Sequence, residues 1–133
     1  MRLRGFDYAK KASEKSDFHK QRIGAAIMYG GKVLAIGYNC EKTHTAQYFY
    51  NHSTRDFEAS QFANKLHAEM MALNKIQYLD IDFSRVSLYV YRESQGEMKL
   101  AKPCPACEAR IREMGIKNVY YTDAGKYVHE RFV

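Results

Sequence analysis

The sequence carries two short motifs that decide its fold, His67-Ala68-Glu69 and Pro103-Cys104-Pro105-Ala106-Cys107. They contribute one imidazole, two thiols in C-x-x-C spacing and one spare carboxylate. A structural zinc site is closed by four protein ligands, whereas three ligands leave a position open for water. The pattern therefore predicts a catalytic metal site made by His67, Cys104 and Cys107. Glu69, which is not needed as a ligand, is the expected general acid and base.

Each motif stands where a strand or a loop enters a predicted helix. Apolar residues at helical spacing from Leu66 predict the first of these helices. Residues 104–114 predict the second, which Gly115 closes as a C-cap residue. Pro105 suits its first position, where a missing N–H costs no hydrogen bond. The two cysteines are three residues apart and share one side of the first turn, where the helix dipole favours thiolates.

The remaining segments predict one mixed sheet with a further helix before it. Gly30-Gly31 and Asp123-Ala124-Gly125 are turn signals, and each joins two predicted strands into a hairpin. The order helix, strand, strand, helix, strand, helix, strand, strand predicts an α/β fold of three layers, α/β/α, around a five-stranded mixed sheet. The expected strands are 23–28, 33–38, 86–91, 119–121 and 127–132. The first helix is expected over residues 6–18, with Phe6, Ala9 and Ala12 on its buried side.

Length and composition suit a single domain. The chain has 133 residues, of which 46% are hydrophobic and 27% charged, enough to bury a core without staples. No apolar stretch approaches the ~20 residues of a membrane span. Residues 1–7 lack the apolar segment of a signal peptide. We therefore expect one domain over residues 1–133, located in the cytoplasm and without membrane contact.

The cysteines do not predict disulfides. There are three of them, too few and too odd for a disulfide framework. In a reducing compartment, C-x-x-C indicates metal or redox chemistry. A thioredoxin-like redox pair would follow the first strand, whereas this pair comes late in the chain. Cys40 is expected to be a small buried residue.

The basic balance favours anionic partners without choosing among them. The net charge of +6 suits nucleotides as well as nucleic acid. The basic residues are spread along the chain, and a solvated face explains the densest groups at least as well as a phosphate track. These groups are Lys10, Lys11 and Lys15, and Arg110 with Arg112.

The joint pattern H-x-E … P-C-x-x-C resembles the motif of zinc nucleobase deaminases. From about Ile23 to Tyr121 the chain is similar to the cytidine/deoxycytidylate deaminase superfamily. It is most similar to the His-Cys-Cys branch of deoxycytidylate deaminases, tRNA adenosine deaminases and editing cytidine deaminases. The resemblance implies a cytidine-deaminase-like fold and a Zn²⁺ cofactor on the three predicted ligands. It also implies that activated water attacks C4 of cytosine or C6 of adenine, that Glu69 moves protons and that ammonia leaves.

The resemblance further implies substrate contacts and an assembly. In the family an Asn at the end of the second strand contacts the substrate, and Asn39 occupies that place. A turn Asn that closes the strand is the alternative. Ala68 is expected to offer its backbone to the base. Oligomers are common in the superfamily, so a homo-oligomer is expected.

Glu41 to Asn64 form an insert rich in polar and aromatic residues that is hard to assign. Two short stretches in it, Lys42-Thr43-His44 and Asn51-His52, would line the pocket or bind a phosphate. Solvated loop histidines are the default interpretation. Some deoxycytidylate deaminases carry a second, structural zinc, which Cys40, His44 and His52 would mimic. Their spacing, however, matches no standard zinc finger.

Two further segments depart from the family pattern. The family has a very short link before the P-C-x-x-C motif, whereas here Arg92 to Lys102 intervene. This segment would border the active site, where Arg92 or Lys102 would contact a phosphate, or it would be an ordinary surface loop. About ten residues follow Tyr121, too few for a crossover to a parallel strand, so the last two strands are expected to pair antiparallel. In the superfamily that arrangement is associated with free-nucleoside and toxin-type deaminases. The metal ligands and the tail thus point to different branches.

Three functional hypotheses follow. The first is a deaminase of a free cytosine nucleotide or nucleoside, with dCMP as the first choice. The second is a deaminase of cytosine or adenine within single-stranded DNA or RNA, since the positive charge and many tyrosines suit stacked bases along a basic groove. The third is a zinc-stabilised binding module, which would not need to keep Glu69. We prefer the first.

Overall fold

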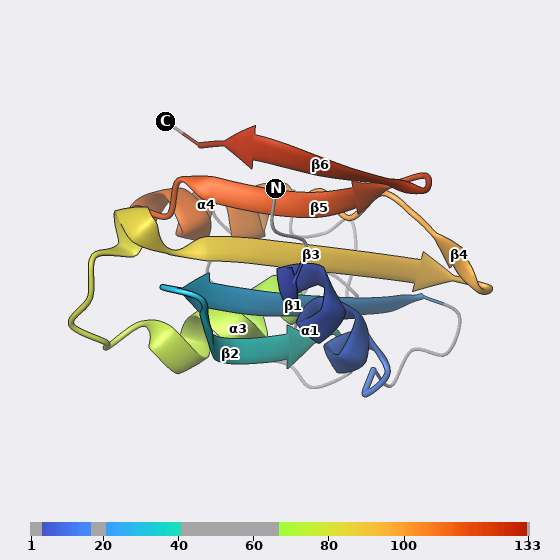
Figure 1. Ribbon diagram of the computed structural model, residues 1–133, viewed down its shortest axis with the longest axis horizontal. Coiled ribbons are helices and arrows are strands. Elements are labelled where there is room, and N and C mark those ends of the chain that lie inside the picture. Colours follow the sequence, from blue (N-terminus) through green and yellow to red (C-terminus); the bar gives the residue numbers. More distant parts are fainter. Residues whose placement is uncertain (1–3, 17–20, 41–66, 133) are drawn as a thin grey trace, which may run out of the picture.

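One mixed sheet forms the middle layer of the molecule (Figure 1). The computed structural model describes residues 4–16, 21–40 and 67–132. The strands lie in the order β2-β1-β3-β5-β6, with the short β4 beside β3. Among these described strands, β3 and β5 pair in parallel, and the other neighbours pair antiparallel. The bounds are β1 Arg22–Tyr29, β2 Lys32–Tyr38, β3 Ser87–Ser94, β4 Glu97–Met98, β5 Asn118–Asp123 and β6 Lys126–Arg131.

Both predicted hairpins are confirmed. Gly30 and Gly31 have φ values of 58° and 82°, and Ala124 and Gly125 have φ values of 46° and 86°. Two consecutive left-handed residues are typical of the turn that matches the twist of antiparallel strands. The second turn pairs β5 with β6 antiparallel, as the short tail predicts.

Over the described residues the sheet has six strands rather than the expected five, because segment 92–102 is not a plain loop. β3 continues to Ser94, and the chain turns at Gln95 and Gly96, whose φ values are 54° and 79°. The two residues of β4 then pair back onto β3. Downstream, Ala101 N–H donates to the Thr122 carbonyl at 2.8 Å. Polar composition hid this hairpin, since a solvated ribbon needs no alternating apolar pattern.

Helices cover both faces of the sheet, which confirms the three-layer architecture (Figure 1). α1 (Arg4–Ser13) packs on one face, and α3 (Ala68–Ile76) and α4 (Pro105–Met114) pack on the other; a short 3-10 turn, η3 (Phe83–Arg85), precedes β3. The predicted buried side of α1 is confirmed, since its three marked residues are at most 3% exposed. α1 ends at Ser13 rather than at residue 18, which lies outside the described residues. None of the described helices is long and apolar enough to cross a membrane.

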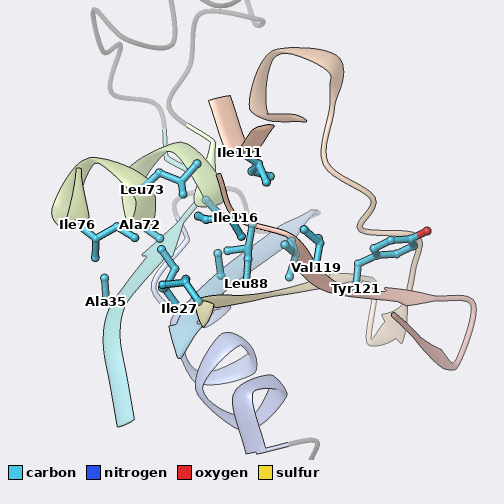
Figure 2. Packing of buried hydrophobic residues seen from close by; sticks show 14 of the residues in the cluster. Ile27, Ala35, Ala72, Leu73, Ile76, Leu88, Ile111, Ile116, Val119 and Tyr121 are labelled. Atoms are coloured by element: carbon cyan, nitrogen blue, oxygen red, sulfur yellow. The ribbon is translucent and has the colours of Figure 1, made fainter. Parts of the chain in front are cut away.

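The main core lies between the sheet and the two helices that carry the motifs (Figure 2). Ile27 and Leu88 from the sheet meet Leu73 of α3 and Ile111 of α4, and all four side chains are fully buried. Burying a side chain of this kind contributes ~1.5–3 kcal/mol. The core therefore fixes the beginnings of α3 and α4 against the same sheet.

Candidate active site

His67 and Cys104 are the N-cap residues of α3 and α4. Both have extended backbone, with φ/ψ of −80°/156° and −68°/165°. Their carbonyls accept the first helical hydrogen bonds, from Met71 N–H at 3.0 Å and Glu108 N–H at 2.8 Å. Neither side chain caps its own helix, as Ser or Asp at this position would. The imidazole and the thiol are thus placed at two helix N-termini without being used for capping.

Gly37 of β2 lets the first turn of α3 lie directly on the sheet. A Cβ at this position would lie 2.2 Å from the Ala68 carbonyl oxygen and 2.7 Å from the Ala72 nitrogen. No other residue fits without moving the helix. Sequence reasoning missed this role, although a glycine inside a strand is a known sign of close backbone approach.

The structure brings the three predicted ligands together. His67 Nδ1 lies 3.4 Å from Cys104 Sγ and 3.6 Å from Cys107 Sγ. All three ligand atoms lie within 4.8 Å of one another. Tetrahedral zinc, with bonds of about 2.3 Å to sulfur and 2.0–2.1 Å to nitrogen, spaces such atoms about 3.6 Å apart. The donor set and its spacing therefore fit zinc.

The two thiols share one proton unequally. The Cys107 thiol donates a hydrogen bond to the Cys104 sulfur and, with His67 nearby, lowers the pKa of Cys104 to about 3. The same hydrogen bond and complete burial raise the pKa of Cys107. Cys104 is thus a thiolate at neutral pH, which is the form that binds a metal.

Glu69 is buried in the first turn of α3, directly beside this triad. Its side chain is 5% exposed and lies within hydrogen-bonding reach of Cys107. Burial raises the pKa of the carboxyl group, and the charge of His67 opposes that shift. A raised pKa makes it easier for a carboxyl group to take up a proton as well as release one, as general acid–base chemistry requires. Ala68, between Glu69 and His67, is completely buried.

Asn39 lies at the end of β2, as predicted, and its amide is engaged by the fold. The side-chain oxygen accepts hydrogen bonds from the Ile23 N–H at 2.9 Å and from the Ser16 hydroxyl. The side-chain nitrogen donates to the Gln21 carbonyl at 2.9 Å. These bonds close β2 onto the start of β1, which is the strand-closing alternative. The substrate contact of Asn39 stays a prediction.

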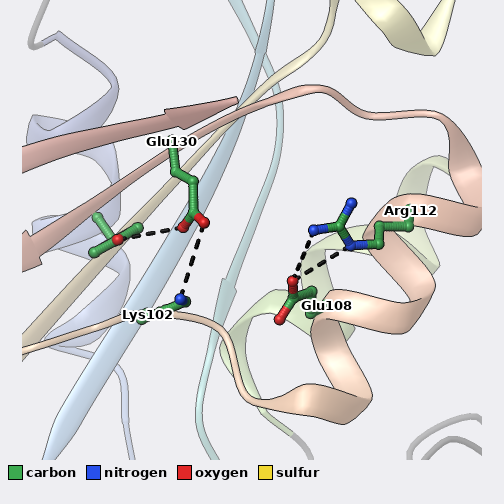
Figure 3. Close-up of polar contacts among 5 residues, drawn as sticks. Lys102, Glu108, Arg112 and Glu130 are labelled. Atoms are coloured by element: carbon green, nitrogen blue, oxygen red, sulfur yellow. Dashed lines mark hydrogen bonds and ion pairs between the residues drawn. The ribbon is translucent and has the colours of Figure 1, made fainter. Parts of the chain in front are cut away.

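Arg92 and Lys102, the candidate phosphate ligands, both have protein partners. The Arg92 guanidinium donates to the Leu100 carbonyl at 3.2 Å and to Gln21 Oε1 at 2.6 Å. Lys102 Nζ lies 3.9 Å from Glu130 Oε1 (Figure 3). A phosphate contact by either residue stays a prediction.

The possible second zinc site cannot be compared with the structure, since His44 and His52 lie outside the described residues, as do Lys42, Thr43 and Asn51. Cys40 is buried, at 5% exposure, as predicted. It packs with Met70 and Cys107 behind the triad. Among the described residues, the group able to hold a metal consists of His67, Cys104 and Cys107.

Arg110 was expected on a solvated face with Arg112, and that prediction is wrong for Arg110. It is 5% exposed and reaches from α4 to α3, where it donates to Asn74, to Gln77 Oε1 at 2.9 Å and to Met70 Sδ at 2.8 Å. Its position three residues after Cys107, on the buried side of α4, was the available signal. Arg110 therefore helps to set the spacing between the helices that carry the ligands. Arg112 is exposed and pairs with Glu108 at 3.0 Å (Figure 3).

The chain belongs to a known family. Residues 3–123 match the family described as the cytidine and deoxycytidylate deaminase zinc-binding region. This family defines a hydrolytic enzyme that deaminates cytosine. The metal-ligand motifs and the surrounding fold are therefore those that the resemblance implies.

Solved structures agree with this assignment. The dCMP deaminase of cyanophage S-TIM5 is 26% identical, with a TM-score of 0.58 over 91% of this chain and 84% of that one. Its complex with dCMP and dUMP gives 25% identity and a TM-score of 0.59 over 91% of this chain and 82% of that one. The cytidine deaminase of Burkholderia pseudomallei shares the fold, with 21% identity and a TM-score of 0.69 over 98% and 92% of the two chains. No curated protein sequence matches the chain significantly.

Proposed function

We propose that this protein is a zinc-dependent deaminase that converts the cytosine of a free nucleotide or nucleoside to uracil, with dCMP as the preferred substrate. The observation that carries the proposal is the triad of ligand atoms at zinc spacing, beside a buried carboxyl group that the triad does not need. The non-enzymatic alternative gives no reason for burying Glu69 there.

The chain's own residues have distinct roles in this reaction. His67, Cys104 and Cys107 would hold the zinc. Bound zinc supplies Lewis acidity, which lowers the pKa of a water ligand towards neutrality. Glu69 takes a proton from the attacking water and delivers it to the amino group at C4, which leaves as ammonia. Burial supports this role because the raised pKa of Glu69 favours the protonated form that the second transfer needs.

Two observations bear on the substrate. The cyanophage S-TIM5 dCMP deaminase, which this chain resembles, has been solved with dCMP and dUMP, which favours a free nucleotide. The antiparallel hairpin of β5 and β6 is the arrangement associated with nucleoside deaminases. We propose that Arg92 or Lys102 meets the phosphate, and that Asn39 and the backbone of Ala68 contact the base.

A substrate panel tests the proposal. Ammonia release is measured for dCMP, CMP, deoxycytidine, cytidine, AMP and adenosine, and for an oligonucleotide that contains cytosine. We expect the highest kcat/KM with dCMP. Turnover of none of the free compounds would overturn the proposal, and faster deamination of the oligonucleotide would favour action on nucleic acid.

The phosphate contacts are tested by comparing dCMP with deoxycytidine, which lacks the phosphate. If Arg92 or Lys102 binds it, Arg92→Gln or Lys102→Gln raises KM for dCMP at least tenfold and leaves KM for deoxycytidine nearly unchanged. An equal loss with both substrates would instead assign the residue to the fold.

We also propose that the enzyme works as a homo-oligomer in the cytoplasm, since oligomers are common in the superfamily. Light scattering of the purified chain measures the assembly, and a monomeric mass with full activity would contradict that part of the proposal.

A further inference from the structure

β5 and β6 leave part of one face of the sheet without a helix. α1 packs on β1, β2 and β3, while α3 and α4 lie on the opposite face. No described helix lies over β5 and β6 on the side of α1 (Figure 1). Side chains alternate along a strand, and Val119, Tyr121 and Val128 pack into the core under α3 and α4. The α1 side therefore carries Asn118, Tyr120 and Thr122 of β5, and Tyr127, His129 and Arg131 of β6.

Stacked rings cross this face, and Phe6 of α1 packs against Tyr89 at 5.2 Å and against one side of Tyr127 at 4.3 Å between ring centroids. Tyr89, Tyr120 and His129 are direct partners across β3, β5 and β6. The Tyr89 and Tyr120 rings are 4.5 Å apart and 14° from parallel, and the Tyr120 and His129 rings are 4.3 Å apart and 10° from parallel. The stack ends at exposed His129, on the edge strand of the sheet. Tyr127, which is 40% exposed, stands about 7 Å further along the same strand.

Basic groups flank the rings. Arg131 is the charged member of the six side chains that β5 and β6 place on this face. The acidic residue between it and His129, Glu130, turns to the other face, where it meets Lys102 and accepts a hydrogen bond from Tyr121 (Figure 3). The six side chains that β5 and β6 place on this face therefore include no carboxylate, although Glu93 of β3 lies on the same side, where it accepts a hydrogen bond from Tyr91.

A hollow of about 180 Å³ continues this face at the start of β3. Its lining includes Arg4 of α1, Arg85 of η3, and Ser87 and Tyr89 of β3. Ser87 and Arg131 both lie opposite Asn118 in the sheet, two residues along their strands from the stacked Tyr89 and His129. Arg85 has an ion-pair partner in Asp82, but at 3.7 Å and with both side chains well exposed the pair is weak. Three arginines thus lie towards one end of the stack, and one of them, Arg4, also donates to the Tyr8 hydroxyl at 3.2 Å.

We propose that this surface, made by Arg4, Arg85, Tyr127, His129 and Arg131, binds single-stranded nucleic acid, with one base on the outer face of His129, since Tyr89 and His129 cover both faces of the Tyr120 ring. Unpaired bases stack on exposed aromatic rings with little regard to sequence, and the cations contact the phosphates between them. Guanidinium groups suit this role because they bind phosphate oxygens in pairs. The surface lies on the opposite face of the sheet from α3 and α4, whose N-termini carry the metal ligands. The binding is therefore separate from deamination of a free nucleotide.

Binding is tested with a fluorescein-labelled 20-nucleotide oligo(dT) by fluorescence anisotropy between 50 and 200 mM salt. Thymine has no exocyclic amino group, so this probe is no substrate for deamination. We expect binding that weakens as salt rises. Combined Arg4→Gln, Arg85→Gln and Arg131→Gln should weaken it at least tenfold and reduce the slope of log K against log salt by about 2, since each contact with a single strand contributes about 0.7. Tyr127→Ala and His129→Ala should each weaken it at least fivefold and leave the slope unchanged.

Matched controls lie on the α3 side of the molecule. Lys75→Gln removes an exposed positive charge there, and Tyr78→Ala removes a tyrosine that is 92% exposed. Both should bind the probe as the unchanged protein does, and so should Glu69→Gln, whatever the outcome of the deamination panel. Tyr127→Leu, which keeps an apolar side chain, replaces Tyr127→Ala if the latter unfolds.

Three results would overturn the proposal. The first is no binding at 50 mM salt. The second is an equal loss in the surface variants and their controls. The third is a protein that sediments as a dimer, does not bind the oligonucleotide and becomes monomeric in His129→Ala. In that case the β6 edge would pair with a second copy of the chain.

Discussion

The surroundings of Glu69 indicate its role, because burying a carboxyl group costs free energy that the fold alone does not require. Glu69→Gln keeps the shape and removes the exchangeable proton. We expect kcat for the preferred substrate to fall about 10²–10⁴-fold, which is the usual contribution of a general acid–base group. Steady-state kinetics measure the loss.

The control for Glu69→Gln is its metal content. Glu69 is not needed as a ligand, so elemental analysis should find as much zinc in the variant as in the unchanged protein. Loss of the metal together with activity would show that the carboxylate supports the metal site instead of moving protons.

Tyr91 gives the fold a predictable response to alkali. Burial, together with Glu93, which accepts the hydrogen bond from the tyrosine hydroxyl, raises the pKa of Tyr91 to about 12, from 10 in the unfolded chain. The folded state therefore keeps a proton that the unfolded state loses. Its contribution to stability is complete below pH 10 and is lost as the pH rises towards 12.

Tyr91→Phe tests this response. Urea unfolding at pH 9 and at pH 11.5 should show that the free energy of unfolding falls less with pH in the variant than in the unchanged protein. An identical fall in both would contradict the role given to Tyr91.

At the residue scale, the sequence predicts what local spacing determines. The three residues that the structure brings together as a possible metal site, and Glu69 beside them, could be named because each stands at a fixed offset from a helix start. Arg110 was placed wrongly because its burial depends on α3 packing against α4, between residues 33 to 40 positions apart. The bonds of Asn39 to Ile23 and Ser16 were hidden for the same reason.

At the scale of elements, the contact between β2 and α3 positions His67, the first of the three proposed metal ligands. In Gly37→Ala the new methyl group overlaps the Ala68 carbonyl and must push the first turn of α3 away from the sheet. Since His67 is the N-cap of that turn, we expect the variant to bind zinc at least tenfold more weakly. Competition with a chromophoric chelator measures the affinity.

Gly24→Ala is the matched control for Gly37→Ala. Its methyl group would lie 1.9 Å from the Ala9 carbonyl oxygen, so it disturbs β1 against α1 on the opposite face of the sheet. We expect it to lower the melting temperature but to leave zinc affinity within about twofold. If both variants weaken zinc equally, general loosening of the fold, and not the β2–α3 contact, controls the site.

The elements with apolar periodicity or glycine turns were predictable, and a polar hairpin was not. β1, β2 and β6 border the turn signals of the sequence; burial alternates along β2 and β6, whereas β1 is an apolar run buried on both faces. The two residues of β4, Glu97 and Met98, pair with β3 through backbone hydrogen bonds, which the side-chain pattern of the sequence does not indicate. The early end of α1 was likewise missed, since its polar last residues continue to suit a helix.

At the scale of the whole molecule, the ligands tie together parts of the chain that are distant in sequence. His67 stands 37 residues before Cys104, and the helices that they begin pack on the same face of the sheet. A metal that bridges them stabilises the folded state alone, because the unfolded chain cannot hold the three ligands together. Metal binding and global stability should therefore change in step.

Chelation tests this coupling. At a zinc concentration 100-fold above Kd the metal contributes about 2.7 kcal/mol, so a strong chelator should lower Tm by about 10 °C for a domain of this size. Adding zinc back should restore it. Cys107→Ser should melt at the lower temperature with or without chelator, whereas Cys40→Ser should keep the full response, since Cys40 is buried near the triad without belonging to it. Two results would mean that His67, Cys104 and Cys107 do not join α3 to α4 through a metal. One is a Tm of the unchanged protein that does not fall when the chelator is added, and the other is a Tm of Cys40→Ser that does not fall.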